Sequence, residues 1–187
     1  MNALHRWYCR TSRWRHHVED ALLPWVLNGT PLEGRVLEIG PGPGLTTDTM
    51  VGKGACVTAL EIDPALAASL GVRLKDRARV LQGSAESMPF PDASFDIVAS
   101  FTMLHHVPSA GAQDRVLAEC SRVLRPGGVL VGCDSRPSLT FRLAHLGDTM
   151  VMVDPRTFAG RLERLGFTAA RVDAEPGTFR FRAVARV

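Results

Sequence analysis

One short segment, from Val36 to Gly44, constrains the fold of this chain more than any other. It begins with apolar, mostly β-branched residues, contains Glu38, and then breaks into alternating prolines and glycines. Such an apolar run is typical of a strand buried inside a parallel sheet. Glycine allows the backbone to turn sharply and allows a ligand to approach it closely. The segment therefore predicts a buried strand that leads into a ligand-binding turn.

The spacing of the glycines narrows the class of ligand. A dinucleotide-binding turn has the pattern G-x-G-x-x-G, which brings a pyrophosphate to the start of a helix. Here Gly40, Gly42 and Gly44 alternate, and Leu45 follows them. Glu38 beside the turn would repel a diphosphate but would attract an ammonium or a sulfonium group. A nicotinamide-dependent oxidoreductase is therefore the weaker alternative.

Strands and helices are expected to alternate after residue 34. This order predicts an α/β, doubly wound fold with a mainly parallel sheet and helices on both faces. Pro64 suits the first turn of a helix that Asp63 caps, and Gly166 suits the end of a later one. Strands are expected at residues 35–39, 56–61, 78–82, 95–100 and 129–134, around Val172, and at 178–187, with helices at 44–52, 64–73, 111–124 and 155–165.

A second strand, in the segment Val57–Asp63, also ends in an acid. Glu61 is expected there to accept both ribose hydroxyls of a nucleoside, as acids do in other Rossmann-like sheets. With the glycine turn, it predicts a nucleoside site at the carboxyl edge of the sheet.

These motifs together resemble class I S-adenosylmethionine-dependent methyltransferases. The resemblance covers roughly residues 30–175 and rests on the first acid–glycine motif, on 57–63, and on three further segments at 80–90, 95–100 and 122–130. The segment Leu104–His106 resembles the subfamily that includes ubiquinone and menaquinone biosynthesis methyltransferases. The resemblance implies a Rossmann-like, seven-stranded sheet whose strand seven is antiparallel.

The resemblance also implies S-adenosyl-L-methionine as cofactor and S-adenosyl-L-homocysteine as product. At position 84 this chain has Ser, where the family usually has an Asp that accepts from the adenine amino group. Ser84 could accept more weakly, or Glu86 could take over. The cofactor is expected to contact Glu38, Gly40, Pro41, Gly42, Gly44, Glu61, Ile62, Ser84, Ala85, Glu86, Ser100 and Phe101.

Two regions are candidates for the chemistry. His105 and His106 follow the strand at 95–100, at the carboxyl edge, and histidine suits a general base near neutral pH. The alternative is that they pack and hydrogen-bond within the loop. His145 and Asp148 lie where the family places its acceptor pocket, and both a structural and an acceptor-binding role are open for them. The expected reaction is methyl transfer to an O or C atom of a small molecule; the alternative is a non-catalytic subunit that binds, or has lost, the cofactor.

The rest of the chain adds fewer constraints. With 187 residues, 45% of them apolar and 22% charged, it is expected to be a single cytoplasmic domain. Residues 1–30 are basic and contain all three tryptophans, which fits a helix packed on the sheet, a lid over the cofactor, or a weak peripheral contact with an anionic membrane. No membrane span, nucleic-acid partner or metal site is expected, and the oligomeric state is not indicated. Cys9, Cys56, Cys120 and Cys133 are expected to be reduced core cysteines.

Overall fold

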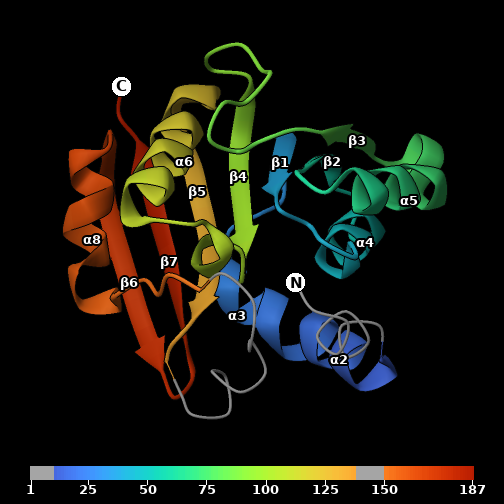
Figure 1. Ribbon diagram of the computed structural model, residues 1–187, viewed down its shortest axis with the longest axis horizontal. Coiled ribbons are helices and arrows are strands. Elements are labelled where there is room, and N and C mark those ends of the chain that lie inside the picture. The colour runs from blue at the N-terminus through green and yellow to red at the C-terminus, as the bar shows by residue number, and fades with distance from the viewer. Residues whose placement is uncertain (1–10, 138–149) are drawn as a thin grey trace.

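The computed structural model describes residues 11–137 and 150–187, and these form one seven-stranded sheet with helices on both faces (Figure 1). The strand order is β3-β2-β1-β4-β5-β7-β6. Strands β3, β2, β1, β4 and β5 are parallel, and β7 pairs antiparallel with both β5 and β6. This architecture is the predicted one. The strands are β1 (Arg35–Ile39), β2 (Cys56–Glu61), β3 (Arg79–Gln82), β4 (Phe95–Phe101), β5 (Leu124–Ser135), β6 (Phe167–Glu175) and β7 (Thr178–Ala185).

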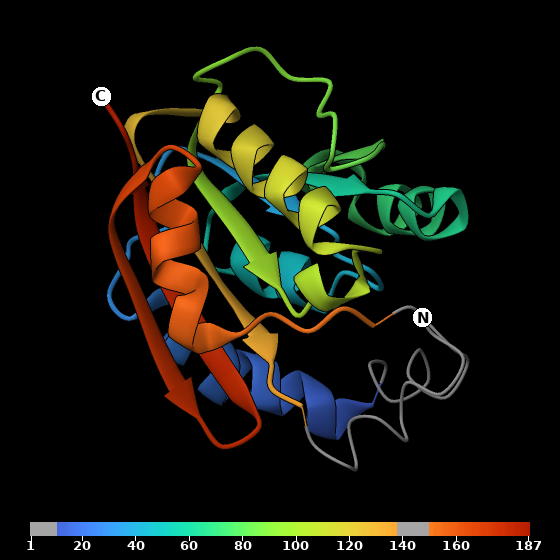
Figure 2. The same cartoon turned by 60° about the vertical axis from the view of Figure 1, so that its left-hand side comes forward.

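The two faces of the sheet carry separate helical layers. Helices α6 (Ala110–Val123) and α8 (Pro155–Arg164) cover one face, where they bury Val116, Leu117 and Phe158 against β4, β5 and β7 (Figure 2). The other face carries α4 (Leu45–Gly52), α5 (Pro64–Leu74) and the N-terminal helices. Alternation along β1 divides its side chains between the layers: Leu37 and Ile39 face α6, and Val36 and Glu38 face α4.

The helix boundaries follow their local capping signals. The Oδ1 atom of Asp63 accepts hydrogen bonds from two amides in the first turn of α5, whose first residue is Pro64. Asp154 caps α8 in the same way through the amide of Arg156, and Gly166 follows the helix with a φ of +99°. The predicted Asp63 cap and the predicted helix end at Gly166 are both confirmed.

The N-terminal segment packs against the sheet. It contains α2 (Ser12–His17), the π-helical segment η1 (Val18–Leu22) and α3 (Leu23–Leu27). Val18, Leu23 and Val26 are at most 2% exposed and join the core on the α4 side. The basic residues of α2 are exposed, as a solvated basic face requires.

Two local expectations differ from the structure. Strand β5 begins at Leu124 rather than at residue 129, because Leu124 already pairs with Phe95 before a register shift whose extra residues lie in β5. The prediction of a core position is wrong for Cys56, which is the first residue of β2 and is exposed, whereas Cys120 and Cys133 are buried. Burial raises the pKa of both buried thiols. Cys9 lies outside the described residues.

Two further observations concern partners. Among the described residues, no helix is both long and apolar enough to cross a bilayer. Nor does that part of the chain bring three His, Cys, Asp or Glu residues together as metal ligands.

Candidate active site

The predicted site residues that the structure describes gather where the parallel strands end. Strands β1, β2, β4 and β5 all point the same way, so their carboxyl ends form one edge of the sheet. Glu38 lies near the end of β1 and Glu61 ends β2. Open α/β sheets bind ligands at this edge, beside the position where the strand order reverses between β1 and β4.

The glycine turn between β1 and α4 needs glycine for two different reasons. Gly40 has a φ of +62°, and a Cβ there would collide with the side chain of Met103, so this position requires close packing. Gly42 has a φ of +55°, but no heavy atom of the described chain, apart from Gly42 and its two neighbours in sequence, lies within 4 Å of the Cβ it would carry. The surface of the turn is therefore open at Gly42, where a ligand can approach the backbone.

Glu61 links the end of β2 to this turn. It is 4% exposed; its Oε2 accepts a 2.8 Å hydrogen bond from the amide of Gly42, and its Oε1 accepts a 2.9 Å bond from the amide of Asp63. A carboxylate offers about four acceptor positions, so two backbone donors leave room for two hydroxyl groups. Glu61 thus orients the turn and keeps acceptor capacity for a ribose.

Glu38 is almost fully enclosed beneath the first turn of α4. It is 1% exposed and accepts hydrogen bonds from the hydroxyls of Thr46 and Thr47, the latter at 2.5 Å. Burial raises its pKa from 4.5 to about 7; the threonine hydrogen bonds oppose this shift, and the charges of Asp48 and Glu61 add to it. The carboxyl therefore holds its proton to higher pH than an exposed glutamate does, and a nearby cation would favour its charged form.

The loop after β3 differs from the simplest expectation for Glu86. Its Oε2 accepts hydrogen bonds of 3.0 and 2.7 Å from the guanidinium of Arg115, so this carboxylate already has a partner. The Oγ of Ser84 accepts from the amide of Glu86 at 3.2 Å. Ile62 next to Glu61 is 64% exposed, although most large apolar side chains are buried, and it offers a flat apolar contact for a base.

The two predicted cofactor contacts at the end of β4 are buried. Phe101 is 6% exposed and belongs to the core cluster beneath the N-terminal helices. Ser100 is 2% exposed, and its hydroxyl has no hydrogen-bond partner within the described parts of the chain.

The turn that follows β4 holds the two predicted histidines. His105 is 1% exposed; its Nδ1 is hydrogen-bonded to Oδ1 of Asp134, and its amide donates to Oδ2 of Asp134 at 3.0 Å. The ring of His106 lies 4.1 Å from that of His105, measured between centroids, and is half-buried. Asp134, 0% exposed near the end of β5, fixes which nitrogen of His105 faces away from it.

A buried amide ties this turn to the segment before α8. The Nε2 of Gln113 donates to the carbonyls of Leu104 (2.9 Å) and Val151 (2.7 Å), and its Oε1 accepts from Arg161 at 2.9 Å. The amide of Val151 in turn donates to the carbonyl of His105 at 2.8 Å. The backbone of the histidine turn is therefore fixed from α6 and from the chain at residue 151.

The sequence prediction missed several residues that build the site. Two sequence signals could have pointed to them. Thr46 and Thr47 carry hydroxyl groups directly after the glycine turn that follows Glu38, and Asp134 is a third acid near the end of a strand. Gln113 has no local sequence signal, because its partners are backbone groups distant in the chain. The predicted acceptor residues His145 and Asp148 lie outside the described residues.

The site fits a nucleoside that carries a cationic group. The turn is open at Gly42, Glu61 has acceptor capacity left for a ribose, Ile62 offers an apolar contact for a base, and Glu38 would be stabilised in its charged form by a cation. This combination matches adenosine attached to the ammonium- and sulfonium-bearing chain of S-adenosylmethionine.

Sequence comparison identifies the family. Residues 37–132, half of the chain, match the family model described as a methyltransferase domain. Ubiquinone biosynthesis O-methyltransferases of Paracidovorax citrulli and Pseudomonas putida are 34% and 30% identical over 160 and 159 residues. Each match covers 79% of this chain but only 65% and 66% of the relative, so the chain spans about two thirds of the length of these curated relatives.

Solved structures share the fold at lower identity. A chain of the complex between the Haloferax volcanii Trm112 methyltransferase activator and a methyltransferase has a TM-score of 0.80 at 17% identity, covering 100% of this chain and 99% of that one. Phosphoethanolamine N-methyltransferase 2 of Haemonchus contortus, in complex with phosphomonomethylethanolamine and S-adenosylhomocysteine, has a TM-score of 0.75 at 15% identity and covers 100% and 61%. With its motifs, sheet order and family match, this chain belongs to the methyltransferase domain family, and its fold and cofactor class are those of the S-adenosylmethionine-dependent methyltransferases.

Proposed function

We propose that this chain transfers a methyl group from S-adenosylmethionine to a hydroxyl oxygen of a small-molecule acceptor. The observation that carries the proposal is the hydrogen bond between Glu61 and the amide of Gly42, which joins the ribose-binding acid to an open glycine turn. A dinucleotide fold would need a different glycine spacing and would not place a buried acid as close to the turn as Glu38.

Each cofactor-binding residue contacts a different chemical group of the cofactor. Glu61 accepts from the ribose hydroxyls, and Ile62 packs against the adenine. Glu38 supplies negative charge for the amino group, directly or through a water molecule. The amide of Ala85 and the hydroxyl of Ser84 meet the edge of the adenine.

The catalytic demand on the protein is small. When bound, S-adenosylmethionine supplies a methyl group that is already activated by its sulfonium. The chain must hold the acceptor in line with that methyl, keep out water, and remove the proton of a hydroxyl acceptor. His105 is our first candidate for the proton acceptor because Asp134 orients its ring. His106 is the second, because it is the more exposed of the two.

The proposal that the acceptor is a hydroxyl comes from the relatives and not from the geometry of the site. The curated relatives are named O-methyltransferases, which favours a hydroxyl over an acidic carbon. His145 and Asp148 remain our predicted acceptor-binding residues. A non-catalytic, cofactor-binding subunit is the second candidate, and Ser84 in place of the family's usual acid favours it.

Calorimetric titration with S-adenosylhomocysteine tests the cofactor site. Glu61→Ala should weaken binding by about 1–3 kcal/mol, because a charged acceptor of two hydroxyls is lost. Glu163→Gln, which changes an exposed acid on α8, serves as the control and should bind as the wild type does. Equal affinity in the Glu61 and control variants would remove Glu61 from the site.

Methyl transfer itself needs a separate measurement. The full chain is incubated with S-adenosylmethionine carrying a labelled methyl group and a panel of phenols, alcohols and carbon acids. Label in a phenol or alcohol supports the proposal, and label only in a carbon acid corrects the acceptor class. Tight cofactor binding without transfer to any member of the panel favours the non-catalytic alternative.

A further inference from the structure

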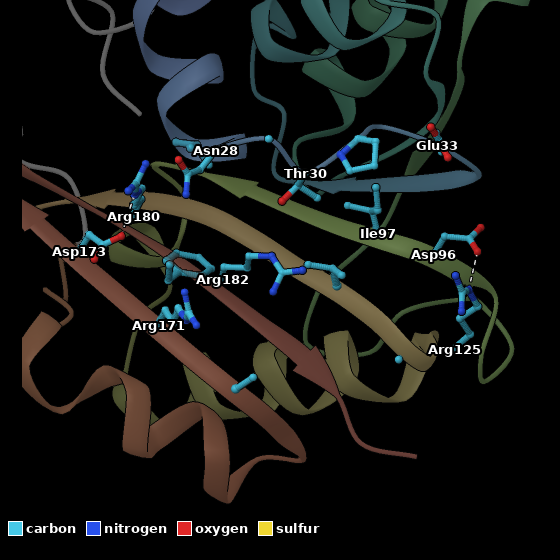
Figure 3. A pocket seen from close by; sticks show the side chains of 17 residues that line it. Asn28, Thr30, Glu33, Asp96, Ile97, Arg125, Arg171, Asp173, Arg180 and Arg182 are labelled. Carbon is cyan, nitrogen blue, oxygen red and sulfur yellow. Dashed lines mark hydrogen bonds and ion pairs between the residues drawn. The ribbon is translucent and has the colours of Figure 1, made fainter.

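One hollow of the molecule lies away from the proposed methyl-transfer site. It is a groove of about 760 Å³ on the sheet face that carries α3 (Figure 3). Its floor is formed by β4, β5, β6 and β7, and its opposite wall by the segment from Asn28 to Pro31 between α3 and β1. It reaches the beginnings of β4 and β5, at Asp96 and Gly127, whereas the glycine turn lies at the carboxyl ends of the strands. The groove is therefore distinct from the cofactor site.

Most charges that line this groove already have partners. Asp96 accepts from Nε of Arg125 at 2.6 Å and from the amide of Arg35 at 2.7 Å, and these contacts lower its pKa. Asp173 accepts from Nε of Arg180 at 2.9 Å. The guanidinium of Arg180 also donates to the carbonyl of Trp25 at 2.6 Å and lies 5.3 Å from the centre of that ring.

Two arginines in the groove differ from the others. Arg171 on β6 and Arg182 on β7 occupy directly opposed positions in the antiparallel ladder. Neither guanidinium forms a hydrogen bond or an ion pair with any residue in the ranges 11–137 and 150–187. Like charges in opposed positions destabilise a strand pair. Within these two ranges, the fold therefore places two arginines opposite each other, and no acid is bonded to either guanidinium.

The surroundings of the pair favour an anionic ligand. Figure 3 shows Arg171 and Arg182 on the strand side of the groove, Asn28 and Thr30 across from them, and Arg180 next to Asn28. Glu33 is the third acid that lines the groove, besides Asp96 and Asp173. It lies at the far end, since the next residue, Gly34, lies against Asp96. Arg171 and Arg182 occupy opposed positions and both line the groove. Guanidinium groups suit a phosphate, which carries up to about two negative charges at neutral pH, because each can donate paired hydrogen bonds to its oxygens.

The size of the groove indicates more than an inorganic ion. Sites for small molecules commonly enclose about 300–1,000 Å³ and combine a few polar anchors with apolar walls. Here Ile97, Val129 and Pro31 supply apolar contacts next to the arginines. We propose that this groove binds a small molecule that carries a phosphate group, and that Arg171 and Arg182 bind the phosphate.

Titration with inorganic phosphate and pyrophosphate tests the proposal on the full chain. Each probe is added with and without S-adenosylhomocysteine, followed by calorimetry and by the thermal unfolding temperature. We expect one saturable site, tighter for pyrophosphate, that is not displaced by S-adenosylhomocysteine. The double variant Arg171→Gln/Arg182→Gln should weaken the affinity about tenfold or more, because two charge-assisted donors are lost.

A control variant with the same net charge distinguishes phosphate binding at this groove from general electrostatic attraction to a basic protein. Arg77→Gln/Arg164→Gln changes two exposed arginines outside the groove and should leave the affinity unchanged. The Arg171/Arg182 variant should unfold at the same or a higher temperature without phosphate, because a like-charge opposition is removed. Failure of saturable binding, equal affinity in both double variants, or displacement by S-adenosylhomocysteine would each overturn the proposal. Since the titration without S-adenosylhomocysteine stands alone, it does not depend on the methyltransferase proposal.

Discussion

Replacement of Glu38 by Gln should make the folded protein more stable above neutral pH and weaken its hold on the cofactor. The carboxyl of Glu38 is 1% exposed, and burial raises its pKa from 4.5 to about 7. Gln keeps nearly the same shape and can still pair with the hydroxyls of Thr46 and Thr47. It differs mainly in having no charge to bury.

The magnitude follows from the shift in pKa. The folded protein binds the Glu38 proton more tightly than the unfolded chain does, so this group contributes stability that is fully present below pH 4.5 and is lost as pH rises to about 7. One pKa unit corresponds to about 1.4 kcal/mol, so ionising Glu38 costs the folded state on the order of 3 kcal/mol above pH 7. Glu38→Gln should not show this loss.

Urea unfolding at a series of pH values, followed by tryptophan fluorescence, measures the effect. The free energy of unfolding of the wild type should fall relative to that of Glu38→Gln between pH 4.5 and 7, and the difference should level off above pH 7. Glu163→Gln, an exposed acid on α8, is the control and should follow the wild type at every pH. Parallel profiles for Glu38→Gln and the wild type would refute the reasoning, because the threonine hydrogen bonds would then fully offset the effect of burial on the pKa.

Cofactor affinity should show the opposite dependence in the wild type. An ammonium group binds the ionised form of Glu38, so affinity for S-adenosylhomocysteine should rise with pH up to about 7, by at most about tenfold per pH unit. In Glu38→Gln the affinity should be lower and should not rise in this window. A variant that binds as tightly as the wild type at pH 8 would show that Glu38 is only a structural acid.

Three further predictions concern the turn, the adenine loop and the histidines. Gly42→Val should abolish S-adenosylhomocysteine binding in calorimetry while circular dichroism still shows a folded protein, since the side chain would occupy open space at a φ of +55°; normal binding by a folded variant would place the cofactor elsewhere. Ser84→Asp should tighten S-adenosylhomocysteine binding by about 1 kcal/mol through a charge-assisted hydrogen bond to the adenine amino group. If Ser84→Asp leaves the affinity unchanged and Glu86→Ala lowers it, then Glu86 binds the adenine amino group instead. With an identified hydroxyl acceptor, His105→Ala should keep its cofactor affinity but lose about 10²–10⁴-fold in turnover. Asp134→Asn should also lower the turnover. Full turnover in His105→Ala would show that His105 only packs in the turn.

The sequence by itself determined the features that depend on neighbouring residues. The apolar run before Gly40 and the Asp63-Pro64 pair predict a strand end and a helix start, because backbone conformation and capping are local properties. The succession of such elements also predicted the layered α/β architecture. The antiparallel strand seven was predicted from the family resemblance alone, since the alternation along Thr178–Ala185 does not indicate direction.

Tertiary structure decided whatever depends on which strands become neighbours and in what register. Asp134 and His105 are 29 residues apart and meet only because β4 and β5 are adjacent and end at the same edge. Cys56 is exposed because it begins β2, a position that the pattern of β-forming residues does not distinguish from the core. Arg171 and Arg182 lie opposite each other because of one antiparallel register, and a shift of one strand by a single residue would put their side chains on opposite faces of the sheet. Local sequence patterns determined where the helices, the strands and the glycine turn lie along the chain. The pairing of distant strands determined which charged side chains meet.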